Sequence, residues 1–217
     1  MMSTEKLIIM LQSMLRGTIV SLEVFFLTLL FAIPLAALIC SGRMSKIKPV
    51  KTVIKWFLLI VRGTPLMLQI ICVYFMPPQL FGVNFGRFPA AIIALSINYA
   101  CYFSEIYRGG IEAIEVGQYE ASYSLGLTKA QTFFSVIVPQ VIKRIVPPMG
   151  SEVMTLVKDT ALVQVIGVVE LLQISKTTSS RLFSTMPLFV AGIFYFAMNG
   201  IVALIFNKIE NKLSYYK

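Results

Sequence analysis

Long apolar runs separated by short polar stretches dominate this chain. A bilayer core about 30 Å thick requires roughly 17 to 25 apolar residues for each helix that crosses it. Five runs meet this requirement, and they cover residues 19–40, 56–76, 88–106, 153–169 and 186–206. The pattern predicts an all-α integral membrane protein with about five transmembrane helices, folded as a single transmembrane domain over residues 1–217.

The fourth run is the weakest of the five, because Lys158 and Asp159 interrupt it. A chain with four spans and a re-entrant segment at this point is the alternative. The first run is too long for a signal peptide and continues into a second apolar run, so we expect it to be retained.

Composition supports the membrane interpretation. Hydrophobic residues make up 57% of the chain and charged residues only 13%, which is too little polar surface to cover a soluble globule of 217 residues. The net charge of +9 does not point to nucleic acid, because the basic residues lie between apolar runs rather than along one face. The chain has no histidine, and its three cysteines lie within apolar runs, so we expect neither a metal site nor a disulfide.

The distribution of Lys and Arg predicts the orientation, because basic residues concentrate in cytoplasmic loops. One side of the membrane receives twelve basic residues: Arg43, Lys46, Lys48, Lys51, Lys55, Arg108, Lys129, Lys143, Arg144, Lys208, Lys212 and Lys217. The other side receives five: Lys6, Arg16, Arg87, Lys176 and Arg181. We therefore expect the N-terminus outside, the C-terminus in the cytoplasm, and the longest connection, about 107–150, on the cytoplasmic side.

This connection has the signals of a folded loop. Residues 111–125 favour a short helix, which Gly126 would end in a conformation with positive φ. Thr128 with Gln131 three residues later forms a capping box at the start of a second short helix, which Pro139 would limit. The pattern predicts a rigid two-helix projection that binds a partner; helices lying flat on the membrane surface are the alternative.

The sequence of this loop carries a family resemblance. Glu120-Ala121-Ser122, then Gly126, then Val136-Ile137-Val138-Pro139 are spaced as in the EAA loop of ABC importer permeases, which they resemble. Residues 62–66, 105–111, 117–118 and 158–162 are similar to stretches typical of the branch that imports polar amino acids. The resemblance implies that Glu120, Ala121, Gly126 and Pro139 couple this chain to an ATPase.

The resemblance also implies an assembly and a function. The chain would be the permease subunit of an ATP-driven importer of polar amino acids in the cell membrane. It would work with two cytoplasmic ATP-binding subunits, a second and identical permease subunit, and an extracytoplasmic solute-binding protein. The chain lacks a P-loop and is not expected to be an enzyme, so a partner would bind ATP and this chain would hold no cofactor. A self-contained secondary transporter or channel is the alternative, although we find no internal repeat to support it.

Polar residues inside apolar runs are candidates for the substrate site, because a charge in the membrane is costly unless it is paired or faces water. Asn98, Tyr102 and Glu105 are spaced to share one helix face. In the alternative reading, Glu105 pairs with Arg108 and only holds the cytoplasmic loop.

A second candidate region is Gly63-Thr64-Pro65, which should break its helix and expose backbone groups to a cavity. A simple kink is the alternative. Asp159 either binds the substrate's ammonium or side chain, or forms an ion pair. The predicted substrate-binding residues are Asn98, Asp159, Glu105, Thr64 and Tyr102. Three acids against two bases in the apolar runs favour a cationic amino acid.

Overall fold

The structure, a computed structural model, describes residues 4–213, which form helices joined by short turns and loops. Lys217, one of the basic residues counted above, lies outside the described residues. In chain order the elements are α1 (Thr4–Arg43), α2 (Lys48–Gly63), α3 (Leu66–Phe81), α4 (Arg87–Glu112), α5 (Val116–Ser124), α6 (Lys129–Gln131), the π-helix η1 (Thr132–Ile137), α7 (Val138–Asp159), the 3-10 helix η2 (Thr160–Ile166), α8 (Leu171–Leu182) and α9 (Met186–Leu213).

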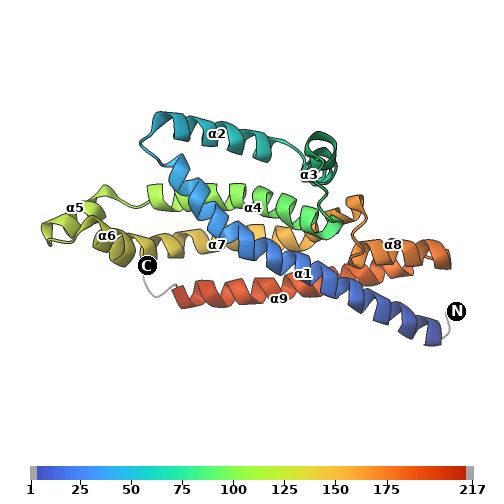
Figure 1. Ribbon diagram of the computed structural model, residues 1–217. Helices are drawn as coiled ribbons and strands as arrows, with labels where there is room; N and C mark the ends of the chain where they lie inside the picture. Colours follow the sequence, from blue (N-terminus) through green and yellow to red (C-terminus); the bar gives the residue numbers. More distant parts are fainter. Residues whose placement is uncertain (1–3, 214–217) are drawn as a thin grey trace.

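Helix α4 lies at the centre of the molecule, with α1 crossing it and α7 beside it, and α9 packs against α7 (Figure 1). Its buried face is rich in small residues, including Ala90, Ala94, Ala100 and Gly110, which let neighbouring helix backbones approach closely. Close approach also occurs at Gly17 in α1, where an added Cβ would lie 2.9 Å from the Cα atom of Leu171. Packing between small residues therefore holds the bundle together where lipid supplies no hydrophobic driving force.

Three helices within residues 4–213 are long and apolar enough to cross a membrane: Leu7–Arg43, Arg87–Glu112 and Met186–Leu213. The pair α2 and α3 adds a fourth candidate if it counts as one bent span. Of the predicted runs, 19–40 lies in α1, 56–76 in the pair α2 and α3, 88–106 in α4 and 186–206 in α9. The membrane-spanning, all-helical class is confirmed, and the count of five spans stays a prediction.

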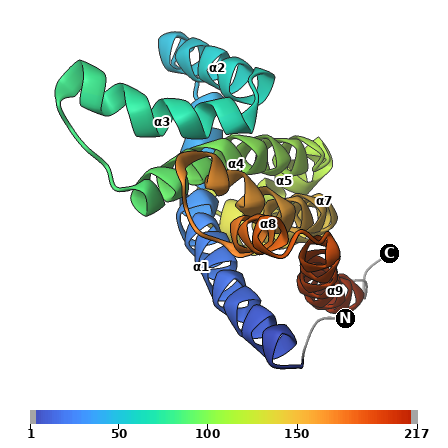
Figure 2. The ribbon, with the colours of Figure 1, turned by 90° about the vertical axis from the view of Figure 1, so that its right-hand side faces the viewer.

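The predicted break in the second run is confirmed. The chain bends by 109° between α2 and α3, and Thr64 and Pro65 lie at the corner (Figure 2). Proline lacks a backbone N–H and restricts the residue before it to extended conformations, which Thr64 adopts with a ψ of 150°.

The prediction of a single helix over 153–169 is wrong. The α-helix ends at Asp159, and the chain continues as a 3-10 helix to Ile166 before Gly167 turns it with a φ of +79°. Tighter 3-10 winding is common where an α-helix ends, and it turns the chain away from the axis of α7.

Two features of the predicted cytoplasmic loop differ from expectation. The helix expected over 111–125 is interrupted, because α4 continues to Glu112 and α5 begins only at Val116. Pro139 does not end a helix: α6, η1 and α7 follow one another without a gap, and Pro139 lies in the first turn of α7. The π-helical turn before it bonds from residue i to i−5, and this wider winding accommodates a residue that has no N–H to donate.

The two ends of the molecule carry different elements. We call residues 116–131, which comprise α5, the turn at Gly126 and α6, the α5–α6 projection. The α5–α6 projection lies at the same end as the C-terminal end of α9, whereas α8 and the N-terminal end of α1 lie at the opposite end (Figure 1). The first and last described helix ends thus lie far apart.

Candidate functional site

A polar pocket lies where the break between α2 and α3 faces α4 and α7. Its volume is about 280 Å³, and it is lined by Thr64, Leu66, Asn98, Tyr99, Tyr102, Glu152, Thr155 and Asp159. Four of the five residues predicted for the substrate site therefore come together here. The fifth, Glu105, does not line this pocket.

The break between α2 and α3 is bridged by Gln69, which the sequence analysis did not single out. Its side-chain amide donates hydrogen bonds to the carbonyl oxygen of Val61, at 2.7 Å, and to the hydroxyl of Thr64, at 2.8 Å. Its amide oxygen accepts a hydrogen bond from Asn98 at 2.9 Å. Gln69 thus fixes the corner against α4, and a lone amide one turn after a Thr-Pro break is the signal that could have identified it.

Asp159 is held by Tyr99 rather than by an ion pair. The phenol of Tyr99, which is buried in α4, donates a hydrogen bond of 2.7 Å to a carboxylate oxygen of Asp159 at the end of α7. Glu152 lies seven residues earlier in α7, two helical turns away on the same face, and lines the same pocket. Sequence reasoning missed Glu152, although its spacing to Asp159 could have revealed it.

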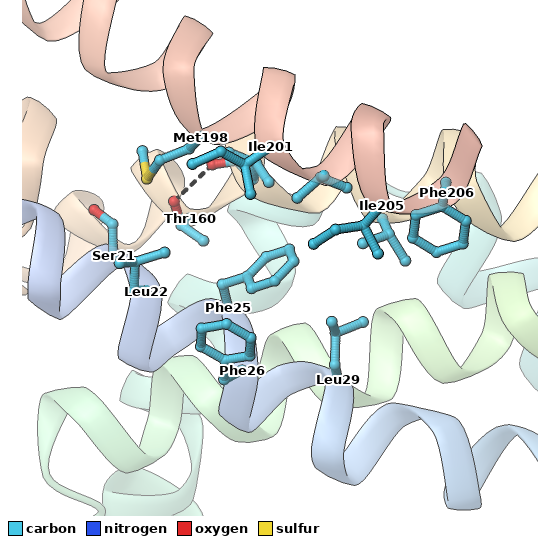
Figure 3. Close-up of a pocket in the computed structure, with 13 residues that line it drawn as sticks. Ser21, Leu22, Phe25, Phe26, Leu29, Thr160, Met198, Ile201, Ile205 and Phe206 are labelled. Carbon is cyan, nitrogen blue, oxygen red and sulfur yellow. Dashed lines mark hydrogen bonds between the residues drawn. The ribbon is translucent and has the colours of Figure 1, made fainter. Parts of the chain in front are cut away.

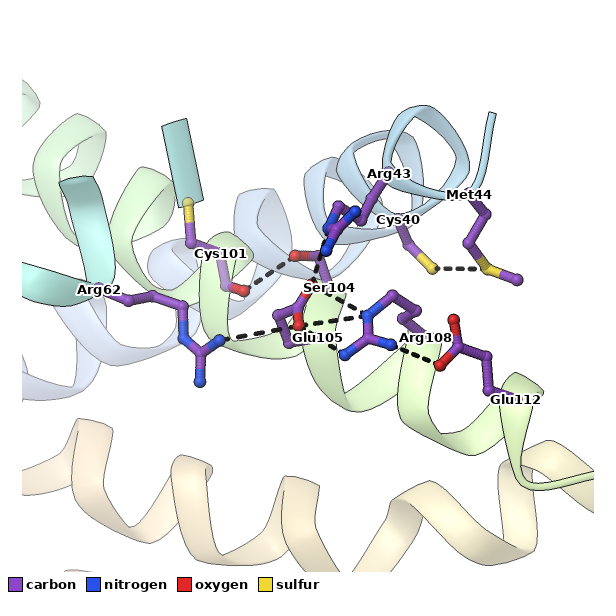
Figure 4. A network of polar contacts seen from close by, with 9 residues as sticks. All are labelled: Cys40, Arg43, Met44, Arg62, Cys101, Ser104, Glu105, Arg108 and Glu112. Carbon is purple, nitrogen blue, oxygen red and sulfur yellow. Dashed lines mark hydrogen bonds and ion pairs between the residues drawn. The ribbon is translucent and has the colours of Figure 1, made fainter. Parts of the chain in front are cut away.

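Glu105 is the centre of a charge cluster outside the pocket (Figure 4). Its carboxylate accepts hydrogen bonds from Arg108, the shortest at 2.8 Å, and lies 3.7 Å from the Arg43 guanidinium and 3.8 Å from that of Arg62. These arginines belong to α4, α1 and α2, so one carboxylate connects three helices. Arg62 also lies over the ring of Tyr102, 5.2 Å from its centroid, which links the cluster to the pocket.

The sequence analysis did not identify Glu170, whose carboxylate is buried. It is fully buried and caps the N-terminus of α8 by accepting hydrogen bonds of 2.7 Å from the backbone N–H groups of Leu172 and Gln173. It also accepts a hydrogen bond of 2.8 Å from the hydroxyl of Tyr195 in α9. These partners satisfy the carboxylate, so its role is to fasten α8 to α9.

The α5–α6 projection has the features that the sequence predicted for a rigid element. Gly126 adopts a φ of +77°, a conformation that residues with a Cβ rarely take, and both hydrogen bonds of the capping box between Thr128 and Gln131 are present. A small apolar cluster that includes Ile114, Ile137 and Val141 anchors the projection to α7.

The surface of the projection is exposed and unusually apolar. Glu120, Ala121, Gly126 and Pro139 are all exposed. Large apolar side chains are exposed beside them, namely Val116, Tyr123, Leu125 and Phe134. Exposed apolar side chains clustered on one folded element are typical of a protein-binding surface.

Comparison with known proteins identifies the class of this molecule. The model of the family described as binding-protein-dependent transport system inner membrane component matches residues 28–215. The chain belongs to this family. It is therefore the permease subunit of an ATP-driven importer, and the alternative of a self-contained secondary transporter or channel is set aside.

The permease is also similar to individual transport proteins. It is 34% identical to the arginine transport system permease protein ArtQ of Bacillus subtilis, over 92% of this chain and 91% of that protein. It is 33% identical to the L-cystine transport system permease protein TcyB of the same species, over 92% of this chain and 86% of that protein. A putative glutamine transport system permease protein GlnP of Rickettsia felis is 30% identical, over 91% of each.

Solved structures agree with the fold of the permease. A crystal structure of an amino acid ABC transporter with histidines superimposes with a TM-score of 0.88 at 32% identity, covering 98% of this chain and 99% of that one. The methionine ABC transporter MetNI, in an inward facing conformation, superimposes with a TM-score of 0.75 over the same shares of the two chains. At 17% identity, MetNI supports the fold alone.

Proposed function

We propose that this permease imports cationic amino acids and that the pocket at the α2–α3 break recognises them during passage. The observation that carries the proposal is the placement of two carboxylates, those of Glu152 and Asp159, in one pocket of about 280 Å³. An isolated carboxylate at membrane depth is costly, and two carboxylates sharing a pocket favour a cationic occupant. Arginine and lysine carry this charge at neutral pH, and histidine carries it when its imidazole is protonated.

The pocket also offers partners for the other end of an amino acid. Leu66 lines it as the first residue of α3, whose first backbone N–H groups have no partner within the helix. Broken membrane helices bind anionic substrate groups at such N-termini, because the backbone dipoles point at them. We assign the substrate carboxylate to this helix end and the amide of Asn98, and the ammonium and side-chain cation to Glu152 and Asp159.

The relatives support an amino acid substrate but differ in which one their names print, since these include arginine, cystine and glutamine. We therefore base the choice of a cationic substrate on the two carboxylates of the pocket. Tyr102 and Thr155 complete the wall, where their side chains limit the size of the occupant. Glu105 is assigned a positioning role, because within residues 4–213 its carboxylate is paired with the arginines of the cluster.

We also propose the assembly and its coupling. Two copies of this permease form the pathway, two cytoplasmic subunits bind and hydrolyse ATP, and an extracytoplasmic protein delivers the solute. The exposed surface of the α5–α6 projection, with Glu120, Ala121 and Gly126, docks on the ATPase. Because α6, η1 and α7 are contiguous, movement of this surface reaches Glu152 and Asp159 along one helical path. Pro139 lies on that path, next to its π-helical turn.

In the proposed orientation the projection and the C-terminal end of α9 lie in the cytoplasm, and the N-terminal end of α1 lies outside. The excess of basic residues at the projection's end of the molecule supports this. The chain itself binds no ATP, since it lacks a P-loop.

The direct test uses the permease reconstituted in liposomes with its ATPase and binding protein. A panel of amino acids is tested for stimulation of ATP hydrolysis. Arginine, lysine or histidine should stimulate hydrolysis more strongly than neutral amino acids. Stimulation by neutral amino acids alone would contradict the assignment of the pocket.

A further inference from the structure

A second cavity, distinct from the polar pocket, opens between α1, α7 and α9 (Figure 3). Its volume is about 290 Å³, and apart from the hydroxyls of Ser21 and Thr160 every side chain that lines it is apolar. We call this cavity the α1–α9 groove. Phe25 and Leu29 of α1 face Met198, Ile201 and Ile205 of α9 across it (Figure 3).

The two hydroxyls in the groove already have partners. Ser21 is within hydrogen-bond distance of Glu170 and of the backbone N–H of Leu171, and Thr160 donates to the carbonyl oxygen of Val157 at 2.8 Å. Water needs two to four polar partners to occupy a buried site, so this groove does not hold it. An amino acid zwitterion would lose its hydration without compensation there.

The position of the groove favours a hydrocarbon chain as its occupant. Helices α1 and α9 both pass the test for a membrane span, and α9 exposes large apolar side chains along its length, including Phe189, Phe196 and Leu204. The molecule's surroundings at this depth are therefore lipid chains. Engineered apolar cavities of about 150 Å³ hold benzene, so the larger groove has room for a stretch of methylene groups.

Helix α9 also indicates the charge of the occupant's polar end. Ile201 and Ile205, which line the groove, are followed on the same helix face by Lys208 and Lys212, at spacings of three and four residues. Both lysines are exposed. An apolar groove that leads to two exposed cations along one stripe matches the chemistry of a lipid with an anionic headgroup.

We propose that the α1–α9 groove binds an acyl chain of an anionic phospholipid whose headgroup contacts Lys208 and Lys212. The lipid belongs to the leaflet at the C-terminal end of α9. This site is separate from substrate recognition, because the groove and the polar pocket share no lining residue. A lipid held between α1 and α9 would stabilise the packing of both against α7.

The single tryptophan of the chain makes a direct test possible. Trp56 is replaced by Phe, and a new tryptophan is introduced as Ile205→Trp, in the groove, or as Leu204→Trp, the matched control. Leu204 is exposed at the same depth but does not line the groove. The full-length permease without its partner subunits is placed in nanodiscs, so that the introduced tryptophan is the only one present. In these nanodiscs either phosphatidylglycerol or phosphatidylcholine carries brominated acyl chains, and quenching of tryptophan fluorescence is measured.

The proposal predicts that brominated phosphatidylglycerol outcompetes brominated phosphatidylcholine at position 205, with a relative binding constant roughly tenfold higher because two lysines attract it. Position 204 should show no preference. Adding Lys208→Gln and Lys212→Gln should abolish the preference at 205.

Two results would overturn the proposal. Equal quenching by both lipids at position 205 would mean that the groove does not select a headgroup. Absence of quenching at 205, with normal quenching at 204, would mean that protein fills the groove, as a second copy of the chain would. Uptake by the substrate pathway is not part of this readout, so failure here leaves the proposed function intact.

Discussion

The hydroxyl of Tyr99 donates a hydrogen bond of 2.7 Å to the carboxylate of Asp159, joining the central helix α4 to the end of α7. This contact holds one carboxylate of the polar pocket in place, at the point where the helical path from the α5–α6 projection ends. It therefore connects the element proposed to receive force with the groups proposed to bind substrate.

Asp159→Asn and Glu152→Gln should each weaken the interaction with a cationic amino acid. Loss of one charge-assisted contact should raise the KM for uptake about tenfold, with smaller effects on neutral amino acids. The measurement is ATP-dependent uptake at several substrate concentrations. Lys158→Gln is the control, since Lys158 is adjacent in sequence but faces a different cavity. Unchanged kinetics in both carboxylate variants would remove them from the site.

Tyr99→Phe should test the positioning of Asp159. The variant keeps the ring, whose centroid lies 5.8 Å from that of Phe103, and loses only the hydroxyl. A lost hydrogen bond to a charged group costs about 1.5 to 3 kcal/mol, so we expect the melting temperature to fall by several degrees. Because the Asp159 carboxylate is then no longer held in place, we also expect KM to rise several-fold. Tyr107→Phe, on the same helix but outside the pocket, should leave KM unchanged. Equal KM values for both variants would contradict the role of Tyr99.

Glu105→Gln should affect stability rather than substrate binding. It leaves Arg43, Arg62 and Arg108 clustered without their shared carboxylate, so the melting temperature should fall by several degrees, corresponding to about 1 to 3 kcal/mol. Glu112→Gln is the matched control, because the Glu112 side chain is 55% exposed and contacts only Arg108 among these arginines. A raised KM with an unchanged melting temperature would instead make Glu105 a substrate contact.

Gly126→Val should uncouple ATP hydrolysis from uptake. A β-branched residue at a φ of +77° costs about 1 to 2 kcal/mol and would shift the turn, so the docking surface would move relative to α7. We expect normal membrane insertion with uptake reduced relative to ATP hydrolysis in proteoliposomes. Gly126→Asn should retain coupling, because Asn tolerates the left-handed conformation. Unchanged uptake in the Val variant would count against the coupling role.

The sequence predicted most of the helices because apolar runs of membrane length have few other solutions. It also predicted the corner at Thr64 and the turn at Gly126, where proline and glycine chemistry restricts the backbone locally. It failed over 153–169, where hydropathy does not distinguish a continuous α-helix from one that tightens into 3-10 winding after Asp159. It also failed at Pro139, because a π-helical turn can absorb a proline and leaves no simple sequence signal.

The sequence also predicted part of the candidate site. Asn98, Tyr102, Thr64 and Asp159 stood out as polar residues within apolar runs, and the structure brings all four to one pocket. Glu152 was missed because it precedes the fourth run by one residue. Gln69 and Tyr99 were missed because their importance depends on partners in other helices, at positions 98 and 159, which no local pattern reveals.

The most direct test of the account compares uptake of labelled arginine and labelled glutamine by the complete reconstituted importer, with the native permease and with the Glu152→Gln, Asp159→Asn double variant. We expect ATP-dependent uptake with a higher kcat/KM for arginine in the native importer, and a fall of about a hundredfold in the arginine-to-glutamine ratio in the double variant. The same ratio in both importers would contradict the account.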